Sequence, residues 1–112
     1  MKKIEAIIRP ERLGLVRKAL EEIGCGGITI TEVKGHGVQR GVVQQWRGTT
    51  YVVDILPKVK LEVVAMDSQI EQVIDAVIEQ GRTGEIGDGK IFVTNVETAV
   101  RMRTGERGDA AL

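Results

Sequence analysis

The residues best suited to chemistry lie in a glycine-rich stretch in the last third of the chain, TGEIGDGKIFV. The relevant positions are Gly84, Gly87, Asp88, Gly89 and Lys90. Glycines let main-chain N–H groups approach an anion closely, and a lysine beside them adds positive charge. Arg101 and Arg103 follow, and the planar arginine fork fits phosphate oxygens. Both arginines point the same way if their segment is extended. The combination predicts a phosphate site, although GDGK alone is equally typical of a turn that leads into a strand.

A second glycine stretch, GHGVQRG, begins at Gly35. It is not a dinucleotide-binding fingerprint, because Arg40 stands where that motif needs its third glycine. It is not a Walker loop either. Neither of these standard phosphate-binding motifs therefore accounts for the second stretch.

Catalytic and metal-binding arrangements are not evident. Cys25 and His36 are the only cysteine and histidine, so neither a disulfide within the chain nor a Cys/His zinc cluster is expected. We expect Cys25 to be a small apolar turn residue and His36 to lie in a loop. The aspartates are scattered, and Ser68 is more simply a helix cap than a nucleophile. The sequence predicts a protein that is not an enzyme.

Composition narrows the class of protein further. The 112 residues suit a single domain, and 16 basic and 16 acidic side chains cancel. Without a basic field, nucleic acid is not an expected partner. No stretch approaches the roughly 20 apolar residues that cross a bilayer, and Glu5 and Arg9 interrupt the signal-like opening MKKIEAIIRP. We expect a cytoplasmic protein without membrane insertion, whose modest core benefits from contact with other subunits.

Side-chain periodicity predicts two similar halves. In the first half, apolar residues alternate over residues 3–9, recur at helical spacing over residues 13–23, and become β-branched over residues 28–33. In the second half, a strand over residues 59–66 precedes a helix that Ser68 and Glu71 would cap, and KIFVTNV follows as a strand. The order β-α-β, repeated, predicts an α+β, ferredoxin-like βαββαβ sandwich. Its four-stranded antiparallel sheet would have both helices on one face.

The segment between the halves lacks regular periodicity from His36 to about Thr50. Such a long irregular segment in a small domain is typical of a functional loop. Residues 50–57, TYVVDILP, predict a strand that pairs near the base of this loop.

The glycine stretches belong to a wider resemblance. TGEIGDGKIFV and RMRTGERG, together with EVKGHG, YVVDILPKVKLEV and MKKIEAIIRP, resemble the PII nitrogen-regulatory signal-transduction proteins, the GlnB/GlnK group, over essentially the whole chain. The resemblance implies one PII domain over residues 1–112, with a projecting T-loop over about residues 37–55 and a C-terminal segment over about residues 97–112. It also implies a homotrimer with ATP or ADP between neighbouring subunits.

The resemblance assigns roles to individual residues. Its adenine contacts would be Ile7, Thr29, Glu62 and Val64. Its phosphate contacts would be Gly37, Gly87, Asp88, Gly89 and Lys90, with Arg101 and Arg103 reaching across from the adjacent subunit. Gly35, Gln39 and Phe92 complete the expected nucleotide set. A 2-oxoglutarate site would use Gln39, Gly41, Lys58 and Gly87, with Gln39 coordinating Mg²⁺ bound to the ATP phosphates.

The loop departs from the family pattern at Val38 and at Thr50, which stands where the family has an acid beside the tyrosine. Val38 stands where the family commonly has a phosphate-contacting arginine, for which Arg40 is a substitute. Tyr51 matches a uridylylated or adenylylated tyrosine, and Thr49 falls where some relatives phosphorylate a serine. The apolar tip predicts contact with a protein partner through Val42, Val43, Trp46 and Arg47. The alternative is that the loop folds back on its own trimer.

The resemblance predicts a sensor of ATP, ADP and 2-oxoglutarate that acts on an ammonium transporter, a metabolic enzyme or a transcription regulator. Three alternatives remain. Val38 favours a PII-like sensor of adenine nucleotide or another metabolite that does not respond to 2-oxoglutarate. A slow ATPase lacks an evident catalytic base, and the cationic cluster disfavours a structural trimer without ligand.

Overall fold

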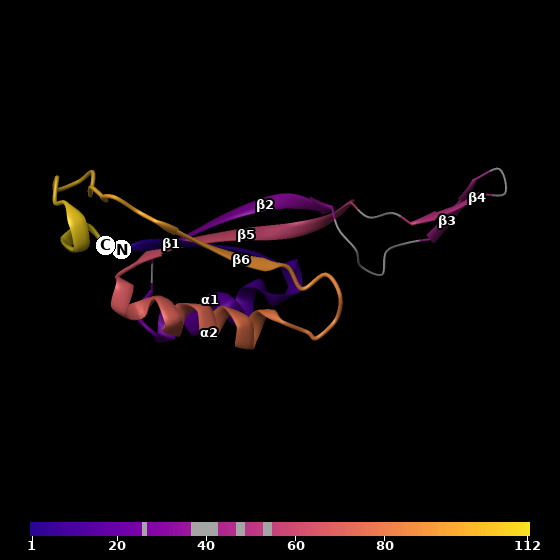
Figure 1. Ribbon diagram of the computed structural model, residues 1–112, viewed down its shortest axis with the longest axis horizontal. Helices are drawn as coiled ribbons and strands as arrows, with labels where there is room; N and C mark the ends of the chain where they lie inside the picture. Colours follow the sequence, from indigo (N-terminus) through magenta and orange to yellow (C-terminus); the bar gives the residue numbers. More distant parts are fainter. Residues whose placement is uncertain (26, 37–42, 47–48, 53–54) are drawn as a thin grey trace.

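The structure, a computed structural model, describes residues 1–25, 27–36, 43–46, 49–52 and 55–112, and for residues 36, 43–46 and 49–52 it describes the backbone alone. Its main sheet contains β1 (Lys2–Ile8), β2 (Ile28–His36), β5 (Ile55–Ala65) and β6 (Lys90–Asn95) in the order β2-β5-β1-β6. All neighbouring strands are antiparallel. The helices α1 (Leu13–Glu22) and α2 (Ile70–Gly81) lie together on one face of the sheet (Figure 1). The predicted ferredoxin-like α+β fold is confirmed.

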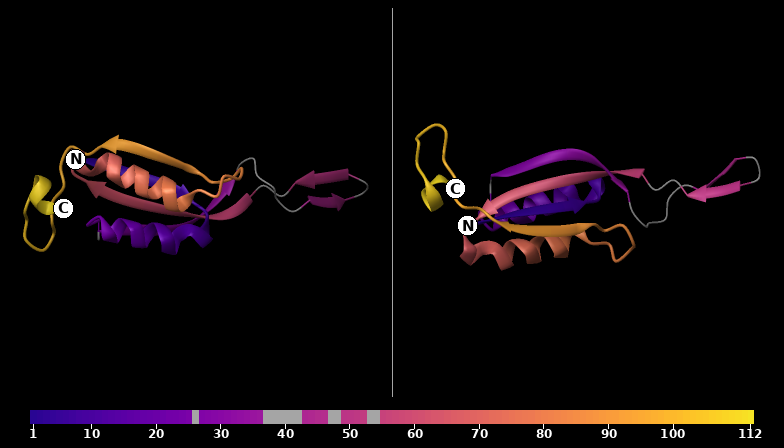
Figure 2. Two further views of the ribbon diagram at one scale, coloured as in Figure 1. Left: turned by 90° about the horizontal axis from the view of Figure 1, so that it is seen from below. Right: turned by 45° about the horizontal axis from the view of Figure 1, so that its top comes forward.

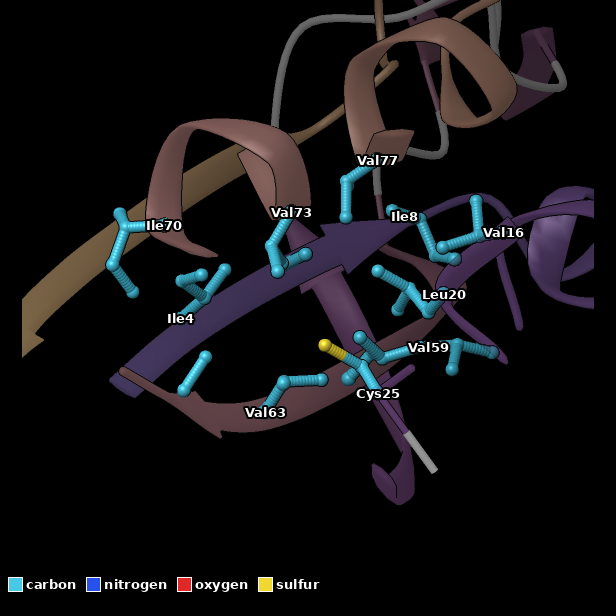
Figure 3. Packing of buried hydrophobic residues seen from close by; sticks show 13 residues of the cluster. Ile4, Ile8, Val16, Leu20, Cys25, Val59, Val63, Ile70, Val73 and Val77 are labelled. Atoms are coloured by element: carbon cyan, nitrogen blue, oxygen red, sulfur yellow. The ribbon is translucent and has the colours of Figure 1, made fainter. Parts of the chain in front are cut away.

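The hydrophobic core lies between the sheet and the two helices (Figure 2). Strand alternation explains its sheet side, because every second residue of β1 and β5 is buried and the register aligns these residues across the strands. The strand residues are Ile4, Ala6, Ile8, Val59, Leu61, Val63 and Ala65. The helices contribute Val16, Leu20, Ile70, Val73 and Val77, which point toward these strands (Figure 3). Cys25, which follows α1, lies in the same cluster beside Val59. Each fully buried aliphatic side chain contributes about 2 kcal/mol.

The opposite face of the sheet has no helix over it, and we call it the uncovered face (Figure 2). Its residues include Lys3, Glu5, Ile7, Lys60, Glu62, Val64 and Phe92, which alternate with the core residues or pair across from them. Lys60 lies 3.5 Å from Glu5 and 3.7 Å from Glu62, and Lys3 lies 3.9 Å from Glu62. The uncovered face therefore combines balanced charge with apolar side chains.

The structure corrects the predictions for the middle of the chain. β2 continues to His36, which pairs with Ile55, so His36 lies in a strand and not in a loop. Of the predicted strand over residues 50–57, residues 50–52 lie in β4 (Thr49–Val52) and residues 55–57 in β5, and residues 53–54 lie outside the described residues. β3 (Val43–Trp46) and β4 form a separate antiparallel ladder where no sustained strand was expected. Antiparallel pairing uses main-chain groups, so it does not require the side-chain alternation for which the sequence was searched.

The helix start also differs from the prediction. The chain enters α2 through a short 3₁₀ turn, Asp67–Gln69, and neither Met66 nor Gln69 makes a side-chain capping bond. Ser68 lies inside that turn, so it does not occupy the capping position that a Ser68–Glu71 capping box requires. Two further 3₁₀ turns lie at Pro10–Arg12 and Gly108–Ala111. Ile78, next to the buried Val77 on α2, is 41% exposed. No helix in the described ranges has the length and apolar character needed to span a membrane.

Candidate functional site

The glycine-rich stretch forms a loop, residues 82–89, that connects α2 to β6, and we call it the glycine loop (Figure 1). Gly87 and Gly89 adopt left-handed backbone angles, with φ of 104° and 92°. A Cβ atom at position 89 would lie 1.7 Å from the main-chain oxygen of Ile7. Only glycine therefore fits at position 89, both for its backbone angle and for its distance from β1.

The carboxylate of Asp88 organises this loop. Its Oδ2 accepts hydrogen bonds from the main-chain N–H groups of Thr83 and Gly84, each at 2.8 Å. Its Oδ1 accepts from the Thr83 hydroxyl at 2.6 Å and from Arg9 Nε at 3.0 Å. The Thr83 hydroxyl is the largest cause of a pKa of Asp88 well below its usual range, and the bonds from Arg9, Gly84 and Thr83 N–H lower it further against the effect of burial. Because both carboxylate oxygens are engaged, Asp88 shapes the glycine loop and does not offer a free side chain to a ligand.

Two cations support the same loop, Arg9 directly after β1 and Lys58 on β5. Arg9 donates from Nη2 to the carbonyl oxygen of Ile86 at 2.9 Å, and Lys58 donates from Nζ to that of Gly87 at 2.7 Å. Among the described residues, Lys58 is the only charged or polar residue that is buried, with 8% exposure. Burial lowers the pKa of Lys58, and the positive charge of Arg9 lowers it further. Positive charge is thus concentrated behind the main chain of the glycine loop.

Several predicted site residues meet at this end of the sheet. Lys90 begins β6 and pairs with Ile7 at the end of β1. Gly35, near the end of β2, lies against the side chain of Lys58. Lys90 is exposed. The first group of site residues therefore consists of Ile7, Gly35, Lys58, Gly87, Gly89 and Lys90.

A second group lies further along the same strands. Thr29 pairs with Glu62, and both line a cavity of about 640 Å³ together with Val64, Cys25 and the C-terminal turn. Ile7 pairs with Lys60, and Val64 lies four residues further along β5, a distance of about 13 Å. Ile7 and Val64 are therefore separated along the sheet, whereas Glu62, two residues from Lys60, lies diagonally across from Ile7 on the same face.

Arg101 and Arg103 do not lie in an extended segment, which corrects the prediction that alternation aligns them. The chain turns at residues 101–105, where Gly105 N–H bonds to the Arg101 carbonyl at 2.7 Å. Arg101 donates from Nη1 to Glu106 at 3.0 Å and from Nη2 to the main-chain oxygen of Leu112 at 3.1 Å. This turn follows β6, whereas the glycine loop precedes it, so the two lie at opposite ends of the sheet (Figure 1). Within one chain the arginines belong with the second group.

The remaining predicted residues are only partly accessible to the structure. The residues outside the described ranges are Gly37, Val38, Gln39, Arg40, Gly41, Val42 and Arg47. They include Gln39, the predicted Mg²⁺ ligand. The backbones of Val43, Trp46, Thr49 and Tyr51 lie in the β3–β4 ladder, where Trp46 pairs with Thr49. Phe92 is 50% exposed on the uncovered face, paired with Glu5.

Two supporting residues were missed from the sequence. Thr83 precedes a glycine and stands five residues before Asp88, a spacing at which two polar side chains can close a loop, and this signal was available. Arg9 is 79 residues away from Asp88 and follows β1 without any motif, so no local signal identifies it.

The glycine loop can bind an anion chemically, because the main chain at its glycines lies beside the exposed Lys90 and close to the buried Lys58. The second group offers a cavity that is lined by the Glu62 side chain and by Leu112, the residue to which Arg101 donates a hydrogen bond. Neither group contains an evident nucleophile paired with a base.

Comparison with known proteins gives a consistent result. Residues 1–106 match a protein-family model described as nitrogen regulatory protein P-II. Proteins of that name from Azospirillum brasilense and Haemophilus influenzae are 58% and 56% identical over 112 residues, covering all of this chain and all of each relative. A third, from Bradyrhizobium diazoefficiens, is 56% identical over 108 residues, or 96% of each chain.

Proposed function

The chain belongs to the nitrogen regulatory protein P-II family, and on that premise we propose that it senses ATP and ADP, together with 2-oxoglutarate, and reports them to target proteins through its T-loop. Members of this family are non-catalytic signal transducers, so the protein is a regulator and not an enzyme. A cytoplasmic location is part of the proposal, because adenine nucleotides and 2-oxoglutarate are metabolites of that compartment.

One observation supports nucleotide binding above all others. The Asp88 carboxylate holds the main chain of the glycine loop at Thr83 and Gly84, and Gly87 and Gly89 carry no side chains of their own that would keep an anion from the main chain next to the exposed Lys90. Main-chain N–H groups and an ammonium are suited to phosphate oxygens. ATP or ADP phosphates are the ligands that we propose for this position.

The division of the site into two groups supports assembly as a homotrimer. The glycine loop and Lys90 lie at one end of the sheet, and Thr29, Glu62 and the C-terminal arginines lie toward the other. A nucleotide placed between two subunits would contact the first group of one subunit and the second group of its neighbour. The exposed apolar side chains and balanced ion pairs of the uncovered face are compatible with burial against further copies.

The position of Lys58 supports a dicarboxylate next to the phosphates. Its ammonium is desolvated and bonds to a neutral carbonyl oxygen, that of Gly87. A carboxylate would be a stronger acceptor for this ammonium than a carbonyl. We propose that 2-oxoglutarate takes this role, with Mg²⁺ bridging it to ATP and Gln39 as a metal ligand.

Target recognition is assigned to the tip of the T-loop. The proposed contacts are Val42, Val43, Trp46 and Arg47, and tryptophan and arginine are among the residue types that most often dominate the energetics of protein interfaces. An ammonium transporter, a metabolic enzyme and a transcription regulator are the target classes. Capture of partners with the unaltered protein and with Trp46→Ala tests the assignment, since loss of the captured partner in the variant is expected.

A second candidate function follows from Val38. A valine cannot donate to phosphate, so the protein would be a nucleotide sensor without a 2-oxoglutarate response if the missing cation were needed for Mg²⁺–ATP geometry.

Calorimetric titration distinguishes the two functions. ATP and ADP are titrated separately, each with and without Mg²⁺ and 2-oxoglutarate. We expect 2-oxoglutarate to bind only with Mg²⁺ and ATP present, and Lys90→Gln to weaken ATP binding about tenfold or more, the loss of one charged hydrogen bond. Lys18→Gln, an exposed change on α1, is the matched control and should have no effect.

The outcomes separate clearly. Binding of nucleotide without any effect of 2-oxoglutarate would favour the second candidate. No nucleotide binding, or a mass by light scattering equal to one 12.2 kDa chain under all conditions, would reject the proposal.

A further inference from the structure

Gly35 stands where the side chain of Lys58 crosses the main chain of β2. A Cβ atom at position 35 would lie 2.7 Å from Lys58 Cγ, 3.5 Å from Cε and 3.7 Å from Cδ. The backbone of Gly35 is not among the left-handed glycines, so an L-residue could adopt its angles. What position 35 requires from glycine is therefore space and not conformational freedom.

The lysine that uses this space is constrained at both ends. Its Cα lies in β5, where Lys58 pairs with Val33, and its Nζ donates to the Gly87 carbonyl at 2.7 Å. The Cγ atom is positioned by χ1 alone, so a Cβ at position 35 cannot be avoided by moving only the tip of the side chain. A change in χ1 moves every atom beyond Cβ and takes Nζ away from Gly87.

We propose that Gly35 is a positioning residue for Lys58, because the missing side chain lets the lysine stem pass across the end of β2 and reach the glycine loop. Lys58 thereby connects two segments that are far apart in sequence, the strand leading into the T-loop and the loop at Gly87. The role of this contact in ligand binding rests on the proposed function, since the carboxylate of a dicarboxylate is taken to compete with the Gly87 carbonyl for Lys58. The steric relation itself does not depend on any ligand.

Three backgrounds test the steric relation by thermal unfolding. Gly35→Ala is made in the unaltered chain, in Lys58→Met and in Lys58→Ala. Methionine keeps an atom at the γ position, whereas alanine removes it. We expect Gly35→Ala to lower Tm by about 5 °C or more in the first two backgrounds and to have little effect in Lys58→Ala. If Gly35→Ala alone does not fold, the double variant with Lys58→Ala is expected to restore folding.

Hydrogen exchange of the main-chain amides in residues 86–89 reports the second half of the proposal. Gly35→Ala should accelerate exchange there, although the substitution lies on a different strand, and Lys58→Ala should do so to a similar extent. Gly14→Ala is the matched control, because its Cβ would meet no atom within 4 Å and it lies on α1. Gly14→Ala should change Tm by the same amount with Lys58 as with Lys58→Ala, and it should leave amide exchange in residues 86–89 unchanged.

Ligand binding completes the test and separates this inference from the proposed function. With Mg²⁺ and ATP present, Gly35→Ala should weaken 2-oxoglutarate binding at least tenfold even though Lys58 is retained. If the unaltered protein binds no nucleotide or 2-oxoglutarate, the proposed function fails while the Tm comparison still decides the role of Gly35. An equal Tm loss from Gly35→Ala in the Lys58→Ala background and in the unaltered chain would overturn the inference.

Discussion

Replacing Asp88 with asparagine tests whether its carboxylate holds the glycine loop in shape. The substitution keeps the size of the side chain but replaces one oxygen with an NH₂ group. Oδ2 now accepts from Thr83 N–H and Gly84 N–H, and Oδ1 accepts from the Thr83 hydroxyl and Arg9. An asparagine that keeps its oxygen at the Oδ2 position turns its NH₂ group toward Arg9, a donor, and toward the Thr83 hydroxyl, which can rotate to accept. The reverse orientation would set the NH₂ group against two main-chain N–H groups.

The magnitude follows from the bonds that are lost. The bond from Arg9 disappears and the bond with the Thr83 hydroxyl loses its charge; each change is assigned about 1 kcal/mol, below the usual value for charged groups, because the Asp88 side chain is 22% exposed. The expected loss is about 2 kcal/mol of unfolding free energy, or about 10 °C in Tm for a domain of this size. Binding of ATP should weaken as well, because the glycine loop is no longer held in one shape.

The pH dependence provides an independent signature. The pKa of Asp88 is lowered in the folded state, so its stabilising contribution is fully present above the unfolded value of about 4 and is lost as the pH falls toward the folded value. The unaltered protein should therefore lose this stability on acidification, whereas Asp88→Asn has no carboxylate to protonate. The difference in Tm between the two proteins should be largest at neutral pH and should shrink below about pH 4.

The assay is thermal unfolding from pH 7 to about pH 2.5, followed by calorimetry with ATP at pH 7. Asp75→Asn, an exposed change on α2, is the matched control. It should change the free energy of unfolding by less than about 0.5 kcal/mol and therefore shift Tm only slightly. A Tm difference that stays constant with pH, or an equal loss in Asp75→Asn, would refute the assigned role of Asp88.

Three further predictions concern single positions. Gly84→Ala should cost about 1 kcal/mol for its left-handed angle, whereas Gly89→Ala should cost far more in thermal unfolding because its Cβ meets the Ile7 carbonyl; equal costs would contradict this geometry. Val38→Arg should bind ATP more tightly than the unaltered chain by calorimetry, because a guanidinium is added near the proposed phosphates, and equal affinity would reject the idea. Tyr51 should gain a nucleotidyl adduct in intact-mass analysis of protein from nitrogen-starved cells, with Tyr51→Phe as the control. The absence of an adduct under every condition would remove this modification from the proposal.

Much of the fold followed from the sequence because burial imposes a period on side chains. Ile4, Ala6 and Ile8 alternate in β1 as predicted, and Val16 and Leu20 repeat at helical spacing in α1. Both patterns are local, since a residue and its neighbours two, three or four positions away share a face. The loop strand β3 was missed, and β4 was predicted only as part of a strand over residues 50–57, because main-chain pairing leaves no such pattern in short segments.

The chemical content of the site was likewise evident locally. Glycines next to a lysine indicated an anion site at residues 84–90, and the structure gives Gly87 and Gly89 the backbone angles that favour glycine. Asp88 was expected to meet phosphate, and the structure shows its carboxylate bonded to Thr83, Gly84 and Arg9.

The sequence by itself therefore determined the two βαβ halves, the core faces and the residue types of the glycine loop, because each depends on neighbours along the chain. Only the tertiary structure decided which distant residues meet. Arg9 reaches Asp88 across 79 positions, and Lys58 passes Gly35 to reach Gly87. The physical reason is that strand register and the path of the chain bring these atoms together, and no local spacing in the sequence encodes either one.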